Sequence, residues 1–171
     1  MEEIKIHIEK VDDVPLLIHL ESSMGISTII DDIIKPHGNR EGLRVGMMIM
    51  VWLSYILSQS DHRMSEVQEW AVSQIRMLKT IIPEEIEAKD FADDKLADGL
   101  RMLSDDANWE QIEGLLSARI IRTYKLEKPA IRLDSTSCTV YHDTEGKELI
   151  SYGYSKDHRP DLAQFKVMLA T

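Results

Sequence analysis

Several residue types are scarce in this chain, and each scarcity excludes a class of protein. Only one of the 171 residues is a cysteine, Cys138, so an internal disulfide and a cysteine-based zinc finger are both excluded. A single thiol also fits a reducing compartment, and we expect a cytoplasmic protein. Hydrophobic residues at 43% and charged residues at 29% nevertheless give the composition of a globular chain, long enough for one domain or two small ones.

Basic residues are also in deficit. The chain has 20 Lys and Arg against 30 Asp and Glu, a formal net charge of -10, which argues against binding nucleic acid through bulk electrostatic attraction. The deficit is uneven, because residues 129–171 hold 5 of the 20 basic and 6 of the 30 acidic residues. The acidity therefore lies in the first three quarters of the chain.

Long apolar runs are missing too. The most apolar stretch, residues 45–57, is shorter than the roughly 20 residues that cross a bilayer, so we interpret it as a buried core helix and expect no membrane partner. The first five residues, Met1-Glu2-Glu3-Ile4-Lys5, are too acidic and too polar for a secretory signal.

Helical periodicity dominates residues 1–128, after an alternating stretch at 1–11 that predicts a short strand or an arm. We expect about six helices there. They comprise a helix from Val14 to Gly25, one at 28–34 capped by Ser27, one at 41–58, one opened by Ser65-x-x-Gln68, a short one at 91–103, and a last one opened by Asn108-x-x-Gln111. The tryptophans Trp52, Trp70 and Trp109 are expected to anchor the core.

The pattern changes at Pro129, because the residue before a proline is disfavoured in a helix. Alternation and turn residues then predict three strands, at 130–141, 148–154 and 165–170, joined as an antiparallel meander. We therefore predict an α+β protein with an all-helical domain at 1–128 and a three-stranded sheet at 129–171.

One carboxylate in the first predicted strand is a candidate site residue. Asp134 lies mid-strand among apolar and hydroxyl residues, where carboxylates are disfavoured and where burial of an unpaired one is costly. A divalent metal such as Mg2+ would offset that cost, because hard cations prefer carboxylate oxygen. The alternative is a structural aspartate that faces solvent or pairs with Arg132 or Lys156.

The polar segment at 152–161 is the second candidate. It combines two tyrosines, two carboxylates and the side chains of Lys156, His158 and Arg159 around a glycine and a proline. Lys156 and Arg159 are suited to grip phosphates, and His158 can add a further donor. The alternative is a charged surface turn in which neighbouring opposite charges pair with one another.

Together these two segments resemble the start of the catalytic domain in prokaryotic insertion-sequence transposases of the DDE class. The resemblance is carried by Ile131-Arg132-Leu133-Asp134-Ser135-Thr136, a turn, and Tyr152-Gly153-Tyr154-Ser155-Lys156-Asp157-His158-Arg159-Pro160-Asp161. The helical region from Val11 to Tyr124 is similar to the helical amino-terminal domain of that family, so the resemblance covers essentially the whole chain.

The resemblance implies that the sheet begins a truncated RNase H-like catalytic fold. Asp134 matches the family's first catalytic acid, which holds two Mg2+ ions together with a second Asp and a Glu. Two such ions activate the attacking oxygen and stabilise the leaving one, with water and then a DNA 3′-hydroxyl as nucleophile. The implied partners are the DNA of transposon ends, contacted by Lys156, His158 and Arg159, and a second or full-length transposase copy.

Family members are longer, and no residue here can be assigned to their second Asp or their Glu. We therefore expect a truncated transposase whose isolated chain does not cleave DNA. Two alternatives stay open: a non-enzymatic module that binds element ends or assembles with a full-length transposase, and a helical interaction domain without a nucleic-acid role.

Overall fold

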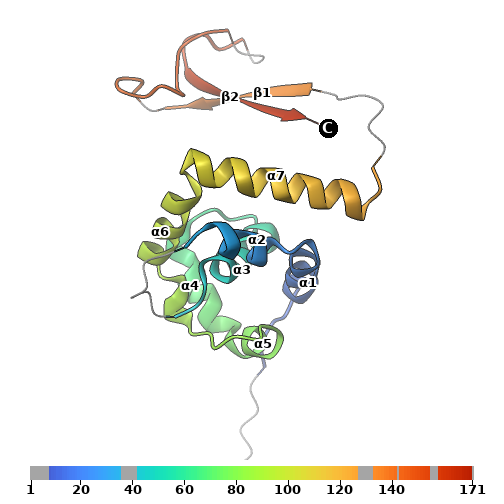
Figure 1. The fold of residues 1–171 in the computed structure, drawn as a ribbon. Coiled ribbons are helices and arrows are strands. Elements are labelled where there is room, and N and C mark those ends of the chain that lie inside the picture. The colour runs from blue at the N-terminus through green and yellow to red at the C-terminus, as the bar shows by residue number, and fades with distance from the viewer. Residues whose placement is uncertain (1–7, 36–41, 127–132, 142, 155–157, 171) are drawn as a thin grey trace, which may run out of the picture. The chain divides into compact units, whose positions relative to one another are not determined.

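The computed structural model describes residues 8–35, 42–126, 133–141, 143–154 and 158–170 (Figure 1). The chain divides into two compact units, Met1–Leu126 and Glu127–Thr171, which we call the helical unit and the sheet unit. The helical unit contains α1 (Val14–Met24), α2 (Ile26–Ile33), α3 (Val45–Gln59), α4 (Met64–Ser73), α5 (Ile75–Ile81), the 3-10 helix η1 (Ala88–Phe91), α6 (Asp93–Leu103) and α7 (Asp106–Thr123). The sheet unit contains β1 (Leu133–Val140) and β2 (Ala163–Ala170), which makes the protein α+β, as predicted. No helix within the described ranges is long and apolar enough to cross a membrane.

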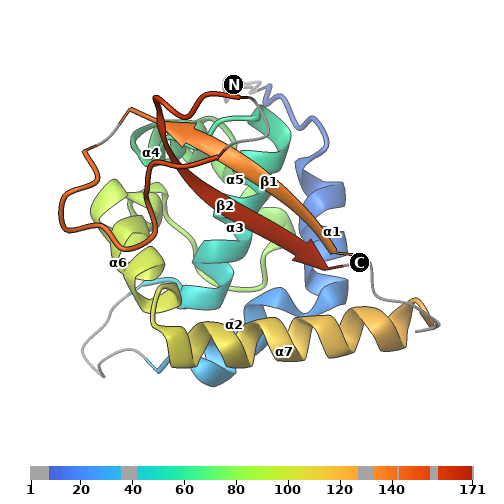
Figure 2. The ribbon, with the colours of Figure 1, turned by 90° about the horizontal axis from the view of Figure 1, so that it is seen from above.

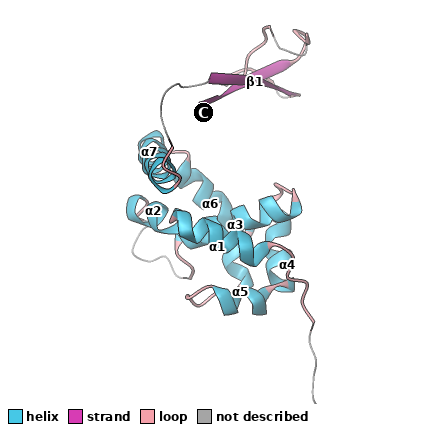
Figure 3. Ribbon diagram, turned by 90° about the vertical axis from the view of Figure 1, so that its right-hand side faces the viewer, coloured by secondary structure: helices cyan, strands magenta, loops and turns pink. Residues whose placement is uncertain are grey.

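Helix α3 is the centre of the helical unit. Ten of its fifteen residues are buried, because apolar side chains occupy nearly every face of the helix. Helices α1, α2 and α6 all contact it, and Figure 3 shows it among the other helices. The prediction that the most apolar stretch forms a core helix is confirmed, although the helix begins at Val45.

Helices α2 and α3 approach each other so closely that one position must be glycine. A Cβ atom built on Gly46 would lie 2.1 Å from the backbone oxygen of Ser27, well inside van der Waals contact. The Gly46 N–H donates a 2.7 Å hydrogen bond to Oδ1 of Asp31, which satisfies one unpaired donor at the start of α3. A side chain at position 46 would therefore separate the two helices and break this bond.

The predicted end of α1 at Gly25 is confirmed, but the start of α2 differs from the prediction. Gly25, with φ of 70°, ends α1 in the left-handed conformation and directly precedes α2, whereas Ser27 is buried inside α2 and caps nothing. The guanidinium of Arg119 in α7 lies where a Gly25 side chain would project, and its Nη1 donates a 3.0 Å bond to the Met24 carbonyl. The absence of a side chain at Gly25 therefore lets α7 cap the end of α1.

The expected starts of α4 and α7 were also misplaced. Asp105, not Asn108, caps α7, and its side chain accepts a 3.0 Å hydrogen bond from the Asn108 N–H. Helix α4 begins at Met64 without a side-chain cap, so Ser65 lies inside its first turn. In each case the helix begins earlier than the expected cap.

Two of the three tryptophans contribute to the core as expected. Trp52 is buried in α3, and Trp70 of α4 meets the ring of Tyr55 edge-on, with ring centroids 5.2 Å apart. The prediction for Trp109 was wrong, because its side chain is 50% exposed on α7 and Ile112 instead makes the buried contact of that helix.

The sheet unit is a two-stranded antiparallel ladder, not a three-stranded meander (Figure 2). Strand β2 pairs directly with β1, from Leu133 opposite Ala170 to Val140 opposite Ala163. The predicted strand at 148–154 is absent, because only Ser151 forms a bridge, in which its N–H and carbonyl bond to Gln164 at 2.9 and 3.0 Å. The predicted arm at 1–11 falls largely outside the described residues, and 8–11 form no strand.

Because α2 and α3 approach so closely, adding one methyl group at Gly46 should lower the stability of the protein strongly. We expect Gly46→Ala to lower the free energy of unfolding by at least about 2 kcal/mol, because the added carbon meets rigid backbone. Gly114→Ala is the matched control: a Cβ there has open space, and alanine should stabilise α7 by up to about 1 kcal/mol. Urea denaturation measures both, and equal stability of Gly46→Ala and the wild type would contradict the packing.

A buried carboxyl group makes the stability of the helical unit depend on pH. Glu21 of α1 is 4% exposed; its Oε2 accepts a 2.8 Å hydrogen bond from Ser54 of α3, and its Oε1 has no donor among the described residues. Burial raises the pKa of Glu21 to about 7, because the charged form loses its hydration, and the Ser54 bond opposes this effect only in part.

This raised pKa predicts the direction of a stability change. Since the ordinary pKa of 4.5 lies below the folded value of about 7, the folded state retains a proton that the unfolded chain releases. The free energy of unfolding should therefore fall as pH rises from about 4.5 to 7, by about 3 kcal/mol from this group. Glu21→Gln should remove that fall in pH-dependent denaturation, whereas Glu113→Gln, an exposed change on α7, should keep it. Parallel profiles for Glu21→Gln and the wild type would show that Glu21 is not the source.

Candidate functional site

Asp134 lies in β1, as predicted, and its side chain is exposed. Its cross-strand partner is Leu169 of β2, and because side chains alternate along a strand, Thr136 and Cys138 share its face. Opposite them, Val167 and Phe165 complete a face that is mostly apolar. The carboxylate thus sits at one end of an apolar sheet face.

The loop that precedes β2 presents an ordered group of polar side chains. Arg159 binds Asp161 with two parallel hydrogen bonds, Nε to Oδ1 at 2.9 Å and Nη2 to Oδ2 at 2.8 Å, and this contact lowers the pKa of Asp161. His158 has φ of 55°, and its ring meets the ring of Tyr154 edge-on at a centroid distance of 5.9 Å. Lys156 lies outside the described residues.

The register separates Asp134 from this loop. The Leu162 N–H donates to the Arg159 carbonyl at 3.2 Å, so the loop turns into β2 at the end where Ala163 pairs with Val140. Asp134 lies six residues further along β1, which corresponds to about 20 Å of strand. The structure therefore does not bring Asp134 beside His158 and Arg159.

The residues present do not complete a magnesium site. No group of three or more His, Cys, Asp or Glu side chains that could hold a metal ion occurs in the part of the chain that the structure describes. The Asp134 carboxylate is of the right donor type for Mg2+, but one carboxylate does not hold two ions. The described residues therefore provide no site for a two-metal reaction.

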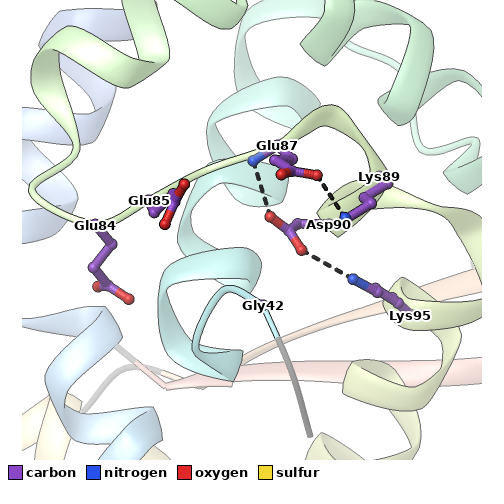
Figure 4. A pocket seen from close by; sticks show the side chains of 7 residues that line it. All are labelled: Gly42, Glu84, Glu85, Glu87, Lys89, Asp90 and Lys95. Atoms are coloured by element: carbon purple, nitrogen blue, oxygen red, sulfur yellow. Dashed lines mark hydrogen bonds and ion pairs between the residues drawn. The ribbon is translucent and has the colours of Figure 1, made fainter.

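The helical unit contains a polar cavity of about 760 Å3 between the residues that precede α3 and the segment around η1 (Figure 4). Four carboxylates and two lysines line it, and Asp90 is the most buried of them. Asp90 accepts bonds from the Glu87 N–H at 2.9 Å, from Lys95 Nζ at 2.9 Å and from the Leu43 N–H. These contacts tie η1 to α6 and to the chain that enters α3.

Asp90 stabilises the fold and is not available to bind a ligand. Burial alone would raise its pKa, but the hydrogen bonds from Lys95 and from backbone N–H groups outweigh burial, so the pKa of Asp90 is lowered. Gly42, with φ of 93°, leaves room for this carboxylate, because a Cβ there would lie 2.4 Å from its Oδ1. Every carboxylate oxygen of Asp90 thus has a donor from the protein, and the cavity has no unused ligand at this position.

A second cavity, of about 380 Å3, lies in the sheet unit beside the Ser151–Gln164 bridge, and we call it the sheet cavity. Gln164, Tyr154 and Glu148 are among its lining residues. Sequence reasoning missed Gln164, because a lone glutamine at the start of a strand carries no signal until the structure pairs it with Ser151. Tyr154 was included only as part of the loop motif.

Comparison with known proteins adds no relative: no protein-family model, no curated protein and no solved structure matches this chain. What bears on the function of this chain is therefore the geometry of each unit and the motif at 131–136 and 152–161.

The hydrogen bonding of Asp90 predicts that its charge matters for folding. We expect Asp90→Asn to lower the free energy of unfolding by about 2 to 4 kcal/mol, because Lys95 and the backbone donors lose a buried anion. Asp98→Asn on the same helix as Lys95 is the control, since its ion pair with Arg101 is exposed and should contribute less than about 1 kcal/mol. Chemical denaturation at pH 7 compares them, and equal losses would show that Asp90 is not a structural centre.

Proposed function

We propose that this chain is the amino-terminal part of a DDE-class DNA transposase of an insertion sequence. In this proposal the parent enzyme performs Mg2+-dependent DNA cleavage and strand transfer, and Asp134 is its first catalytic acid. The helical unit corresponds to the helical domain that precedes the catalytic core, and β1 and β2 correspond to the opening strands of an RNase H-like sheet.

One observation carries this proposal. The aspartate of the first motif is on a strand, and the second motif, at 152–161, leads directly into the strand that pairs with it. A carboxylate on the first strand of an antiparallel ladder is the arrangement that the motif resemblance implies. The two motifs thus belong to one sheet unit, although Asp134 and the loop lie at opposite ends of the β1–β2 ladder.

The loop side chains support a role in phosphate contact. Arg159 presents a planar guanidinium held in place by Asp161, and such a group is suited to two-point contact with phosphate. Together with His158 and Lys156 it forms the proposed DNA-binding group, in a unit that lacks the strong acidity of the helical unit.

A second candidate function is a non-enzymatic module that assembles with a full-length transposase or with another copy of itself. The sheet unit favours it, because two strands alone make a marginal fold and the apolar side chains of Leu133, Val167, Met168 and Leu169 are exposed. An intact catalytic domain or a second copy would cover these side chains.

The proposal predicts DNA binding without DNA cleavage by the isolated chain. We expect salt-sensitive binding to duplex DNA that Arg159→Gln weakens about threefold to tenfold, since one phosphate contact is lost. Arg122→Gln on α7 makes the same change of charge outside the loop and should leave the affinity unchanged. Fluorescence anisotropy at two salt concentrations, with a nicking assay in Mg2+ and Mn2+, tests both statements.

Three outcomes of this experiment separate the candidates. Cleavage that depends on Asp134 would show that the chain is an active nuclease and would contradict the incomplete site. Binding that Arg122→Gln weakens as much as Arg159→Gln would place the DNA contact elsewhere. Absence of DNA binding, together with co-purification with a full-length transposase, would favour the assembly module.

A further inference from the structure

The sheet cavity contains an unused hydrogen-bonding group. Gln164 is 4% exposed, and its Oε1 has no hydrogen-bond donor among the described residues. A Cβ atom on Gly153 would lie 3.6 Å from Nε2 of Gln164, and both residues line the cavity, so the amide is at the cavity wall. A half-turn about the last side-chain torsion exchanges the amide nitrogen and oxygen, so this position can present either a donor or an acceptor.

The aromatic ring of Tyr154 lines the same cavity. Tyr154 is 75% exposed, and the edge-on contact with His158, at an interplanar angle of 88°, fixes the orientation of its ring. Exposed, oriented aromatic rings are the surfaces on which unpaired bases stack.

Charged groups at the cavity define which molecule fits. Lys166 follows Gln164 by two residues on β2, so both side chains lie on the same side of the strand, and its ammonium can meet a phosphate. Glu148 contributes a carboxylate, which accepts hydrogen bonds but donates none when ionised. A ligand with an amino group, a flat ring and a phosphate satisfies all three features.

We propose that the sheet cavity binds one unpaired DNA base that carries an exocyclic amino group. This inference rests on the proposed function, and it deepens that function by naming the form of DNA that the sheet unit recognises. A volume of about 380 Å3 is near the lower limit of ligand pockets and suits one nucleotide, whereas a base stacked and paired in a duplex cannot enter. Adenine, cytosine and guanine carry the amino group, and thymine lacks it.

The test measures the affinity of the full chain for hairpin DNA with one bulged base and for the fully paired hairpin. We expect a bulged cytosine to improve binding about tenfold, and a bulged thymine to improve it less. Gly153→Leu should abolish the improvement by filling the cavity, and Gly153 lacks the left-handed φ that would strain this change. Tyr154→Ala should also abolish it, whereas Tyr141→Ala, which alters an exposed tyrosine outside the cavity, should retain it.

A second arm uses free dCMP and dTMP and needs no duplex contact. Weaker binding of dTMP than of dCMP, lost in Gly153→Leu, supports the cavity even if the chain does not bind duplex DNA and the proposed function fails. Duplex binding with no preference for a bulged base overturns the cavity and leaves the proposed function standing. A preference that persists in Gly153→Leu also overturns it, because the base would then bind elsewhere.

Discussion

The helical unit depends on the burial of α3 on nearly all of its faces. A helix without a polar face is unfavourable at the protein surface, so neighbouring helices must cover it. Helices α1, α2 and α6 pack against α3 and cover it. Close packing around it is possible because Gly46 admits the backbone of α2 and Gly99 of α6 faces the side chains of Met48 and Ile49. Small residues at these crossings therefore complement the large apolar ones.

The sheet unit, in contrast, has little buried apolar core. Its buried residues are few, and Ala163 and Gln164 at the start of β2 are the most buried of those described, while apolar side chains further along both strands are exposed. A unit of this kind gains little free energy from its own core. Its order depends on backbone pairing between β1 and β2 and on contacts around the Ser151–Gln164 bridge.

Features that depend on local sequence pattern were predicted correctly, whereas features that depend on contacts between residues distant in sequence were not. The apolar stretch that became α3 and the strand that carries Asp134 follow from periodicity alone. The start of α2 did not, because Ser27, expected as a cap, is buried inside α2 with its backbone oxygen against Gly46 of α3. The strand at 148–154 failed for the same reason, since β2 takes the pairing position beside β1 that the hairpin would have used.

For the candidate site, the motif located Asp134 and the loop, but it contained no information on the distance between them. That distance follows from the strand register, which no local pattern specifies. The proposed role of Gln164 depends likewise on a cavity, because residues between β1 and β2 and residues of β2 itself form that cavity together.

The bond between Arg119 and the Met24 carbonyl joins residues 95 positions apart and, with the contacts of α7 to α2, makes α7 part of the helical unit. A shortened protein that stops before α7 would leave the last turn of α1 without its cation and would uncover α2. Expression boundaries for crystallisation or for domain exchange should consequently fall after Thr123.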